Sequence, residues 1–156
     1  MITSRRVAAA LAFIAAIGFS VALFLYKYRQ AVFVEAASRG NIASMKVLLA
    51  VGADANEFEC QKDRCRTPLI AATQTGQYEA AQFLLERAAN VNMRMKRGQT
   101  ALMFASYYGH PKLVKLFLAR GADVNASFEG DTALAWAKQK GHTEIVNLLI
   151  AGGATH

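Results

Sequence analysis

Cys60 and Cys65 are the residues whose type and spacing point most directly to chemistry, because they are the only two cysteines in this 156-residue chain. They stand five positions apart in a mostly polar stretch, residues 57–66. An even pair in such a stretch favours a disulfide made in an oxidising compartment. Closing so short a loop would stabilise the fold by only about 2 kcal/mol, so its use would be to hold the loop's shape. Two free thiols on a cytosolic loop are the alternative, and a structural zinc site usually needs four ligands.

The three histidines do not form a reactive group. His110 and His142 each follow a glycine at equivalent places in the sequence, which favours a structural hydrogen-bonding role, and His156 is the last residue. No Ser/His/Asp arrangement, phosphate-binding glycine loop or pair of carboxylates stands out. The sequence therefore predicts a protein without catalytic residues, metal ions or cofactors.

Glycines recur at nearly constant intervals along the chain: Gly40, Gly76, Gly109 and Gly141. The intervals are 36, 33 and 32 residues, and three threonines repeat the last two of them: Thr67, Thr100 and Thr132. A fixed period near 33 residues is the sequence signature of a stacked repeat. The longer first interval contains the two cysteines, so we interpret this stretch as an insertion of three residues.

Each repeat is predicted to form two short helices followed by a loop. In the third repeat, Thr100 is expected to cap the first helix and Pro111 to begin the second. Gly121 is expected to end that second helix in the left-handed conformation. The equivalent residue of the second repeat is Ala88, for which this conformation costs about 1 kcal/mol, so we expect that helix end to be reshaped.

These phrases resemble the ankyrin repeat. Thr67-Pro68-Leu69-Ile70-Ala71-Ala72 is close to the family's Thr-Pro-Leu-His-x-Ala phrase, and Gly52-Ala53-Asp54 and Gly121-Ala122-Asp123 are close to its endings. The resemblance covers residues 31–156. It implies an all-α solenoid of about four helix-turn-helix repeats with hairpin-like loops, at about 31–59, 64–94, 97–127 and 130–156. The first repeat lacks the Thr-Pro start and is interpreted as an N-terminal cap with a more polar outer face.

Ahead of the repeats, residues 7–26 form an uncharged stretch of 20 residues, ten of which are Leu, Ile, Phe or Val. A helix of this length spans about 30 Å, the thickness of a bilayer core. We expect residues 1–29 to be a signal anchor with one hydrophobic transmembrane helix. A cleaved signal peptide is the rival, because Arg5 and Arg6 precede the stretch and Ser20-Val21-Ala22 offers a cleavage site. Cleavage after Ala22 would leave four apolar residues at the new terminus, which favours the anchor.

The orientation of such a span is left open by its flanking charges, since basic residues stand on both sides of it: Arg5, Arg6, Lys27 and Arg29. The cysteine pair favours an oxidising compartment. We therefore expect a single-pass membrane protein, bacterial, with its repeats on the extracytoplasmic, periplasmic side. A soluble periplasmic or secreted protein released by cleavage and a cytoplasm-facing adaptor are the alternatives.

The net charge of +7 belongs largely to the residues that flank the uncharged stretch. From residue 31 onward the chain has 14 basic and 11 acidic residues, a net charge of +3. Binding to nucleic acid would predict a stronger, one-sided basic surface. The charge therefore argues against a nucleic-acid partner and leaves a protein partner as the expectation.

Ankyrin repeat proteins generally bind their ligands on a concave face made by the loop tips and the exposed side of each first helix. The resemblance implies partner-binding residues at equivalent positions of this chain. In the third repeat these are Arg94, Lys96, Arg97, Gln99, Tyr107 and Tyr108. In the fourth they are Phe128, Glu129, Asp131, Gln139 and Lys140, and in the second Asp63, Arg64, Arg66, Gln74 and Thr75. Neighbouring Tyr and Arg residues suit the hot spots of protein interfaces.

An alternative interpretation makes residues 93–97 a solvated loop and lets one of the two tyrosines pack against its neighbouring repeat. Trp136 takes a position where the pattern has an aliphatic core residue, so we expect it in the core. Taken together, the sequence predicts a membrane-anchored, non-catalytic module that binds a protein of unknown identity. A second copy of the same chain would also fit as the partner.

Overall fold

The computed structural model describes residues 28–61 and 64–155 of the chain. Residues 28–38 are helical. Seven further helices follow: α2 (Ile42–Ala50), α3 (Pro68–Gln74), α4 (Tyr78–Glu86), α5 (Ala101–Tyr108), α6 (Pro111–Ala119), α7 (Ala133–Lys140) and α8 (Thr143–Ala151). Within the described residues, no helix has both the length and the apolar character needed to cross a membrane. The predicted span, residues 7–26, lies outside them.

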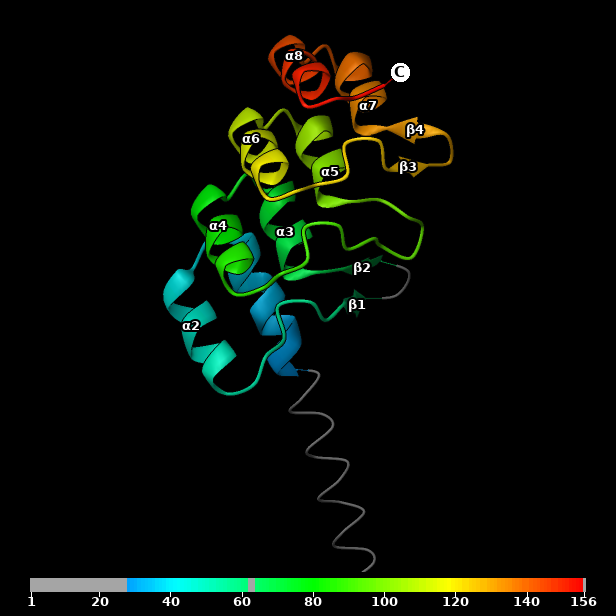
Figure 1. Ribbon diagram of the computed structural model, residues 1–156. Helices are drawn as coiled ribbons and strands as arrows, with labels where there is room; N and C mark the ends of the chain where they lie inside the picture. Colours follow the sequence, from blue (N-terminus) through cyan, green and yellow to red (C-terminus); the bar gives the residue numbers. More distant parts are fainter. Residues whose placement is uncertain (1–27, 62–63, 156) are drawn as a thin grey trace, which may run out of the picture.

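The helices form four pairs that stack into a solenoid (Figure 1). The first helices make one row, in which α3 packs on α5 and α5 on α7, and the second helices make another, from α2 through α4 and α6 to α8. The core lies between the rows and includes Phe33, Met45, Leu84, Leu102, Phe117 and Leu149. The predicted solenoid of four helix pairs is confirmed for the described residues.

Two short hairpins project from the loops on the side of the first helices (Figure 1). One pairs β1 (Glu59–Gln61) with β2 (Arg64–Arg66), and the other pairs β3 (Ser127–Phe128) with β4 (Asp131–Thr132). Between α4 and α5 the chain makes a similar turn without a strand, closed by the Met95 N–H donating to the Gln99 carbonyl at 2.8 Å. The loops are hairpin-like as predicted, and the short strands add a small β component to the helical fold.

The recurring threonines begin the first helix of each complete repeat. Each hydroxyl oxygen accepts a hydrogen bond from the backbone N–H three residues on, which satisfies a donor that has no partner inside the helix. The pairs are Thr67 with Ile70, Thr100 with Met103, and Thr132 with Ala135. Pro111 occupies the first turn of α6 as predicted, and Pro68 has the same place in α3.

The recurring turn glycines meet two conditions at once. Gly109 has φ +75°, and a Cβ placed on it would lie 2.8 Å from Cε1 of His142 in the next repeat. The Nε2 atom of His142 lies 3.2 Å from the carbonyl oxygen of Tyr107, so its N–H donates to that carbonyl. Gly76 has the same relation to His110, with 2.9 Å between the added Cβ and Cε1. The structural role predicted for His142 is confirmed, and close approach of the next repeat explains why glycine recurs.

The helix end at Ala88 is not reshaped, and the expectation that it would be is wrong. Ala88 keeps the left-handed conformation, with φ 61°, close to the φ of 76° at Gly121. The Ala89 N–H donates to the Leu84 carbonyl at 3.0 Å, as the Ala122 N–H does to Phe117. The carbonyl of Ala88 also accepts a hydrogen bond from Asn56 at 3.0 Å. Contacts on both sides therefore hold an alanine in a conformation that favours glycine.

Asparagine side chains join the ends of consecutive repeats. The Asn92 amide donates to the Gly121 carbonyl at 3.0 Å and accepts from the Asp123 N–H at 2.8 Å. Two other asparagines make the same pair of bonds: Asn56 with Ala88 and Asn90, and Asn125 with Gly153 and Thr155. The asparagine four positions after the left-handed residue of each helix end, Gly52, Ala88 or Gly121, thus connects one repeat to the next.

Arg29 and Gln30 take this connecting role at the N-terminal end, where no asparagine precedes. Gln30 is buried, accepts from the Asp54 N–H at 3.2 Å and donates to the Asp54 carbonyl at 2.9 Å. Arg29 donates to the Val51 carbonyl at 2.8 Å. The predicted boundary between residues 29 and 31 therefore falls inside a helical segment whose residues already belong to the folded repeats.

The outer face of the first repeat is apolar, contrary to the polar cap expected there. Val47 is 63% exposed and Val51 is 57% exposed. Val47 and Val51 stand seven and eleven residues after Gly40, and the equivalent residues after Gly76 are Phe83 and Arg87. Phe83 is 8% exposed because α4 packs on α2, whereas no described element packs on the corresponding side of α2.

Candidate functional site

Five aromatic side chains gather on the first helices of the third and fourth repeats and on the hairpin beside them. We call Phe104, Tyr107, Tyr108, Phe128 and Trp136 the aromatic surface. The Trp136 ring meets three of the others edge-on, with centroids 6.0 Å from Phe104, 5.6 Å from Tyr107 and 6.3 Å from Phe128. Such edge-to-face pairs are favourable beyond the area that they bury. The aromatic surface is therefore one packed unit assembled from α5, α7 and β3.

Trp136 lies on this surface and not in the core, so its predicted place is wrong. The residues of α7 that are buried are Ala133, Leu134 and Ala137, and Trp136 is only half-buried beside them. Its indole N–H donates to Oδ2 of Asp131 at 3.3 Å, a partner at the edge of the hairpin. A buried indole would need such a partner inside the core. At the surface, Asp131 of β4 supplies this hydrogen-bond partner.

The aromatic surface stays partly open to solvent. Tyr108 is 45% exposed, and the other four rings are half-buried. Tyr107 packs against the neighbouring repeat through Trp136, as the alternative interpretation has it for one tyrosine. The ammonium of Lys140 lies 4.2 Å from the centroid of the Tyr107 ring, in cation–π geometry. Tyr107, Tyr108, Phe128, Asp131 and Lys140, which the sequence names separately, are thus brought together.

The loop between α4 and α5 adds charge next to this surface. Arg94 donates to the Ser127 carbonyl at 3.2 Å and lies 3.9 Å from the Asp123 carboxylate, so it fixes the loop to the following repeat. Lys96 and Arg97, which we call the basic tip, are exposed, and Gln99 is half-buried. Gln139 is exposed on α7. Arg94 is therefore a structural link, whereas the basic tip is open to a partner.

Two of the residues named in the second repeat, Arg66 and Thr75, make contacts within the chain. Arg66 lies 3.9 Å from the carboxylate of Glu35, whose other oxygen is 2.8 Å from Arg39. The Thr75 hydroxyl donates to the Ser38 carbonyl at 2.7 Å. Gln74 is half-buried, Arg64 lies on β2, and Asp63 is outside the described residues. Of the side chains described in this set, Arg66 and Thr75 are thus engaged within the chain.

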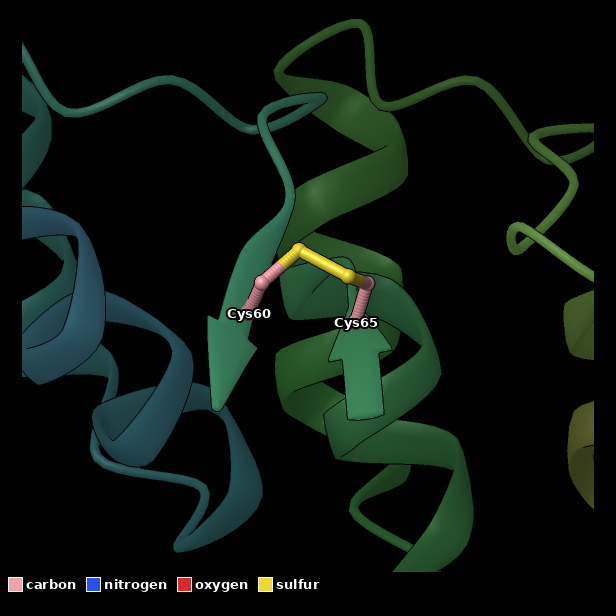
Figure 2. Close-up of a disulfide and its surroundings, with 2 residues drawn as sticks. All are labelled: Cys60 and Cys65. Carbon is pink, nitrogen blue, oxygen red and sulfur yellow. A yellow bond between two sulfur atoms is a disulfide. The ribbon is translucent and has the colours of Figure 1, made fainter. Parts of the chain in front are cut away.

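Cys60 and Cys65 are bonded to each other across the β1–β2 hairpin (Figure 2). They are directly paired in the register of the two strands, with 4.0 Å between their Cα atoms and 2.04 Å between their sulfurs. Cys65 is buried and Cys60 is exposed. The disulfide closes the hairpin at the loop tip of the second repeat.

His110 borders the aromatic surface, with its ring centroid 6.3 Å from that of Tyr108. Burial lowers the pKa of His110 below 6.5; the backbone carbonyl of Gln74 opposes this shift and the nearby His142 adds to it. Among the residues that the structure describes, no three His, Cys, Asp or Glu side chains gather as metal ligands would. Near neutral pH His110 is therefore uncharged, and the positive charge beside the aromatic surface comes from lysine and arginine.

Phe104 and Trp136 are the two members of the aromatic surface that the sequence analysis misses. Both stand four positions after a capping threonine, Thr100 and Thr132, and the equivalent residue of the second repeat is the small Ala71. This shared offset was visible in the sequence. It would have placed both rings on the same side of α5 and α7 as Tyr107, because they occupy equivalent positions of stacked repeats.

Comparisons with known proteins agree with the repeat architecture. A family model described as ankyrin repeats matches the chain in three overlapping stretches, residues 12–95, 33–128 and 91–156. The chain is 39% identical over 85 residues to the Arf-GAP with coiled-coil, ANK repeat and PH domain-containing protein 2 of Gallus gallus, which is 54% of this chain and 11% of the relative. It is 46% identical over 59 residues to the ankyrin repeat and SAM domain-containing protein 6 of Rattus norvegicus, 37% of this chain and 7% of the relative.

A third relative is the probable E3 ubiquitin-protein ligase XBOS32 of Oryza sativa subsp. japonica, 34% identical over 92 residues, 59% of this chain and 18% of the relative. The chain spans less than a fifth of the length of each of these three proteins. The stacked helix pairs, the capping threonines and the matched family model lead to one conclusion: this chain belongs to the ankyrin repeat family.

Proposed function

We propose that the aromatic surface and the basic tip form the site at which this domain binds a protein partner. Ankyrin repeats indicate a protein–protein interaction module and are generally non-catalytic. The observation that carries the choice of site is the half-open aromatic surface, which packs five rings together and still leaves Tyr108 45% exposed. Aromatic residues held in place by their neighbours give large contact area at low cost in conformational entropy.

The charges around this surface indicate the chemistry of the partner. Lys96, Arg97 and Lys140 are exposed on its borders, together with the acidic Glu129 and Asp131. Asp131 is already bonded to Trp136, and Lys140 lies over Tyr107. A segment with an apolar or aromatic side chain flanked by carboxylates would cover the rings and face the lysines. Complementary charge of this kind raises the rate of association and excludes basic partners.

Membrane attachment through residues 7–26 is part of the proposal. Its support is the sequence: 20 uncharged residues with basic residues on both sides, ending next to the folded repeats at residue 28. The disulfide in the β1–β2 hairpin supports a place for the repeats outside the cytoplasm, because disulfides persist in oxidising compartments. Release of the repeats by a signal peptidase and a cytoplasmic orientation are the rival arrangements.

The test of the binding site is a pull-down of partners from detergent extract with the full chain and a double variant. Arg97→Glu with Tyr108→Ala removes one charge of the basic tip and the most exposed ring. We expect at least about a tenfold loss of the captured partner, because central aromatic and arginine residues contribute about 2 kcal/mol or more each to such interfaces.

The matched control is Lys112→Glu with Tyr78→Ala, which makes the same two changes on the row of second helices. Lys112 is exposed on α6 and Tyr78 begins α4. This variant should capture the partner as the unaltered chain does. Equal capture by all three proteins, each shown to be folded by circular dichroism, would place the binding site elsewhere.

A further inference from the structure

The N-terminal end of the solenoid carries an exposed apolar face. Five large hydrophobic side chains are prominently exposed in the described part of the chain, and three of them lie at this end: Tyr28 at 63%, Val47 at 63% and Val51 at 57%. Val47 lies on α2 and Val51 is the C-cap residue of that helix, four positions on, so both lie on the same side of its C-terminal end. We call Tyr28, Val47 and Val51 the terminal face.

The repeat pattern shows that the position of Val47 is covered in the later repeats. Residues seven positions after the turn glycines are Val47, Phe83 and Leu116 in the first three repeats, and the last two are only 8% and 9% exposed. They are covered because α4 packs on α2 and α6 packs on α4. Val47 occupies the position that a preceding repeat would bury.

Eleven positions after the turn glycine, the first repeat has Val51 where the second and third repeats have an arginine. The equivalent residues of the second and third repeats are Arg87 and Arg120, both exposed. A residue at this position faces solvent in the interior repeats, where arginine suits it. A valine there, beside the uncovered Val47, extends the apolar character of the end of the solenoid where a polar cap is expected.

The terminal face lies where the uncharged stretch enters the folded domain. Arg29 donates to the Val51 carbonyl, and its guanidinium lies 3.3 Å from where a Cβ on Gly52 would be. The start of the helical segment 28–38 and the C-terminal end of α2 are therefore side by side, at the end of the molecule opposite α8 (Figure 1). Only Lys27 separates Tyr28 from the uncharged stretch 7–26. If that stretch spans a bilayer, the terminal face is held at its surface.

We propose that the terminal face rests on the membrane, with Tyr28, Val47 and Val51 in the headgroup region and Lys46 and Arg29 toward lipid phosphates. The composition is that of membrane interfaces, where tyrosine and basic residues flank apolar side chains. This inference rests on the proposed membrane attachment and adds an orientation to it. The solenoid stands on its first repeat, which places the aromatic surface of the third and fourth repeats away from the bilayer.

The experiment uses the full chain in phosphatidylcholine and phosphatidylglycerol vesicles, with an environment-sensitive fluorophore on a single introduced cysteine. The two natural cysteines are bonded to each other, so a label without reductant goes to the new thiol. The test sites are Val51→Cys and Val47→Cys. Ile150→Cys is the matched control, because Ile150 is an equally exposed aliphatic residue, at 54%, at the opposite end of the solenoid.

We expect blue-shifted emission from labels at residues 47 and 51, and several-fold stronger quenching of them by lipids with a nitroxide near the headgroup than of the label at residue 150. If all three labels are quenched equally weakly while the chain floats with the vesicles, the docking is wrong and the attachment stands. If the chain does not float with the vesicles, both fail. A blue shift at residue 51 without quenching by lipid would overturn the proposal in favour of a protein covering, either residues of the same chain or a second copy.

Discussion

At the scale of single residues, equivalent positions of successive repeats carry residues that meet the same backbone requirement. A helix end needs a left-handed residue, and Gly52, Gly121 and Gly153 supply it with φ between 76° and 93°. Ala88 does so with φ 61° and pays for it in strain. After Gly52, Ala88 and Gly121, the asparagine four positions later bonds the loop to the next repeat, so one local phrase both ends a helix and joins two repeats.

Ala88→Gly should stabilise the domain. Glycine adopts the left-handed conformation without the penalty of a Cβ, and this gain exceeds the extra entropy of the unfolded chain. We expect an increase of about 0.5–1 kcal/mol in the free energy of unfolding, measured by urea denaturation. Gly121→Ala is the reciprocal control, because a Cβ there would meet nothing within 4 Å and only the backbone penalty is added. A loss of stability in Ala88→Gly would show that the strain inferred at Ala88 is absent.

His110 should make stability depend on pH. Burial lowers its pKa in the folded state below 6.5, so the unfolded chain binds the proton more readily. Above about pH 6.5, His110 therefore does not reduce the free energy of unfolding. As the pH falls from there through the folded-state pKa, protonation favours the unfolded chain and the free energy of unfolding decreases. His110→Gln copies Gln77, the residue at the same place in the second repeat. Denaturation at about pH 7.5 and about pH 5 should show a smaller loss of stability in the variant than in the unaltered chain, and an equal loss would contradict this role.

At the scale of elements, the hairpins are peripheral to the helix pairs, which pack directly on one another. The β1–β2 hairpin is closed by the disulfide, while the loop between α4 and α5 makes its turn with two backbone hydrogen bonds and no strand. The β3–β4 hairpin carries Phe128 and Asp131, which pack on and bond to Trp136. The loop at this position is thus held by a disulfide in the second repeat, by backbone hydrogen bonds in the third and by aromatic packing in the fourth.

Reduction of the disulfide should weaken the domain without unfolding it. A loop closed across five positions restricts the unfolded chain little, so we expect a loss of at most about 2 kcal/mol in the free energy of unfolding. The comparison is urea denaturation with and without dithiothreitol. Cys60→Ala with Cys65→Ala is the control, and its stability should not respond to the reductant. Complete unfolding on reduction would mean that the hairpin supports the helices around it.

The sequence predicts the helix pairs well because their signals are local. Thr67, Thr100 and Pro111 cap or begin helices through contacts within a few residues, and the turn glycines impose the period. What it misses depends on contacts between repeats. Trp136 looks like a core residue along its own helix and becomes a surface residue because α5 and β4 offer it Phe104 and Asp131.

The first repeat shows the same limit of local signals. The missing Thr-Pro start predicts a cap, and general experience of repeat proteins makes caps polar. Only the stacked structure shows that Val47 stands where later repeats bury Phe83 and Leu116. The predicted span, residues 7–26, and Asp63 lie outside the described residues, and the partner-binding residues stay a prediction that the aromatic surface makes more specific.

At the scale of the whole molecule, the two ends of the solenoid differ. The N-terminal end carries the apolar terminal face, and the C-terminal half carries the aromatic surface with its bordering lysines. With the first on a bilayer, the second is presented away from it to a partner. Under both proposals, the protein would connect a membrane to a protein segment with apolar and acidic side chains.

Photo-crosslinking from within the aromatic surface tests the central claim most directly. A p-benzoylphenylalanine in place of Tyr108 keeps the phenyl ring and adds a benzoyl group at an exposed position, and the same residue in place of Tyr78, on the row of second helices, is the control. Irradiated in the cells that make the protein, the chain with the crosslinker at residue 108 should form one discrete protein adduct that the chain with the crosslinker at residue 78 does not form. A discrete adduct from residue 78 with none from residue 108 would contradict the assignment of the aromatic surface as the binding site.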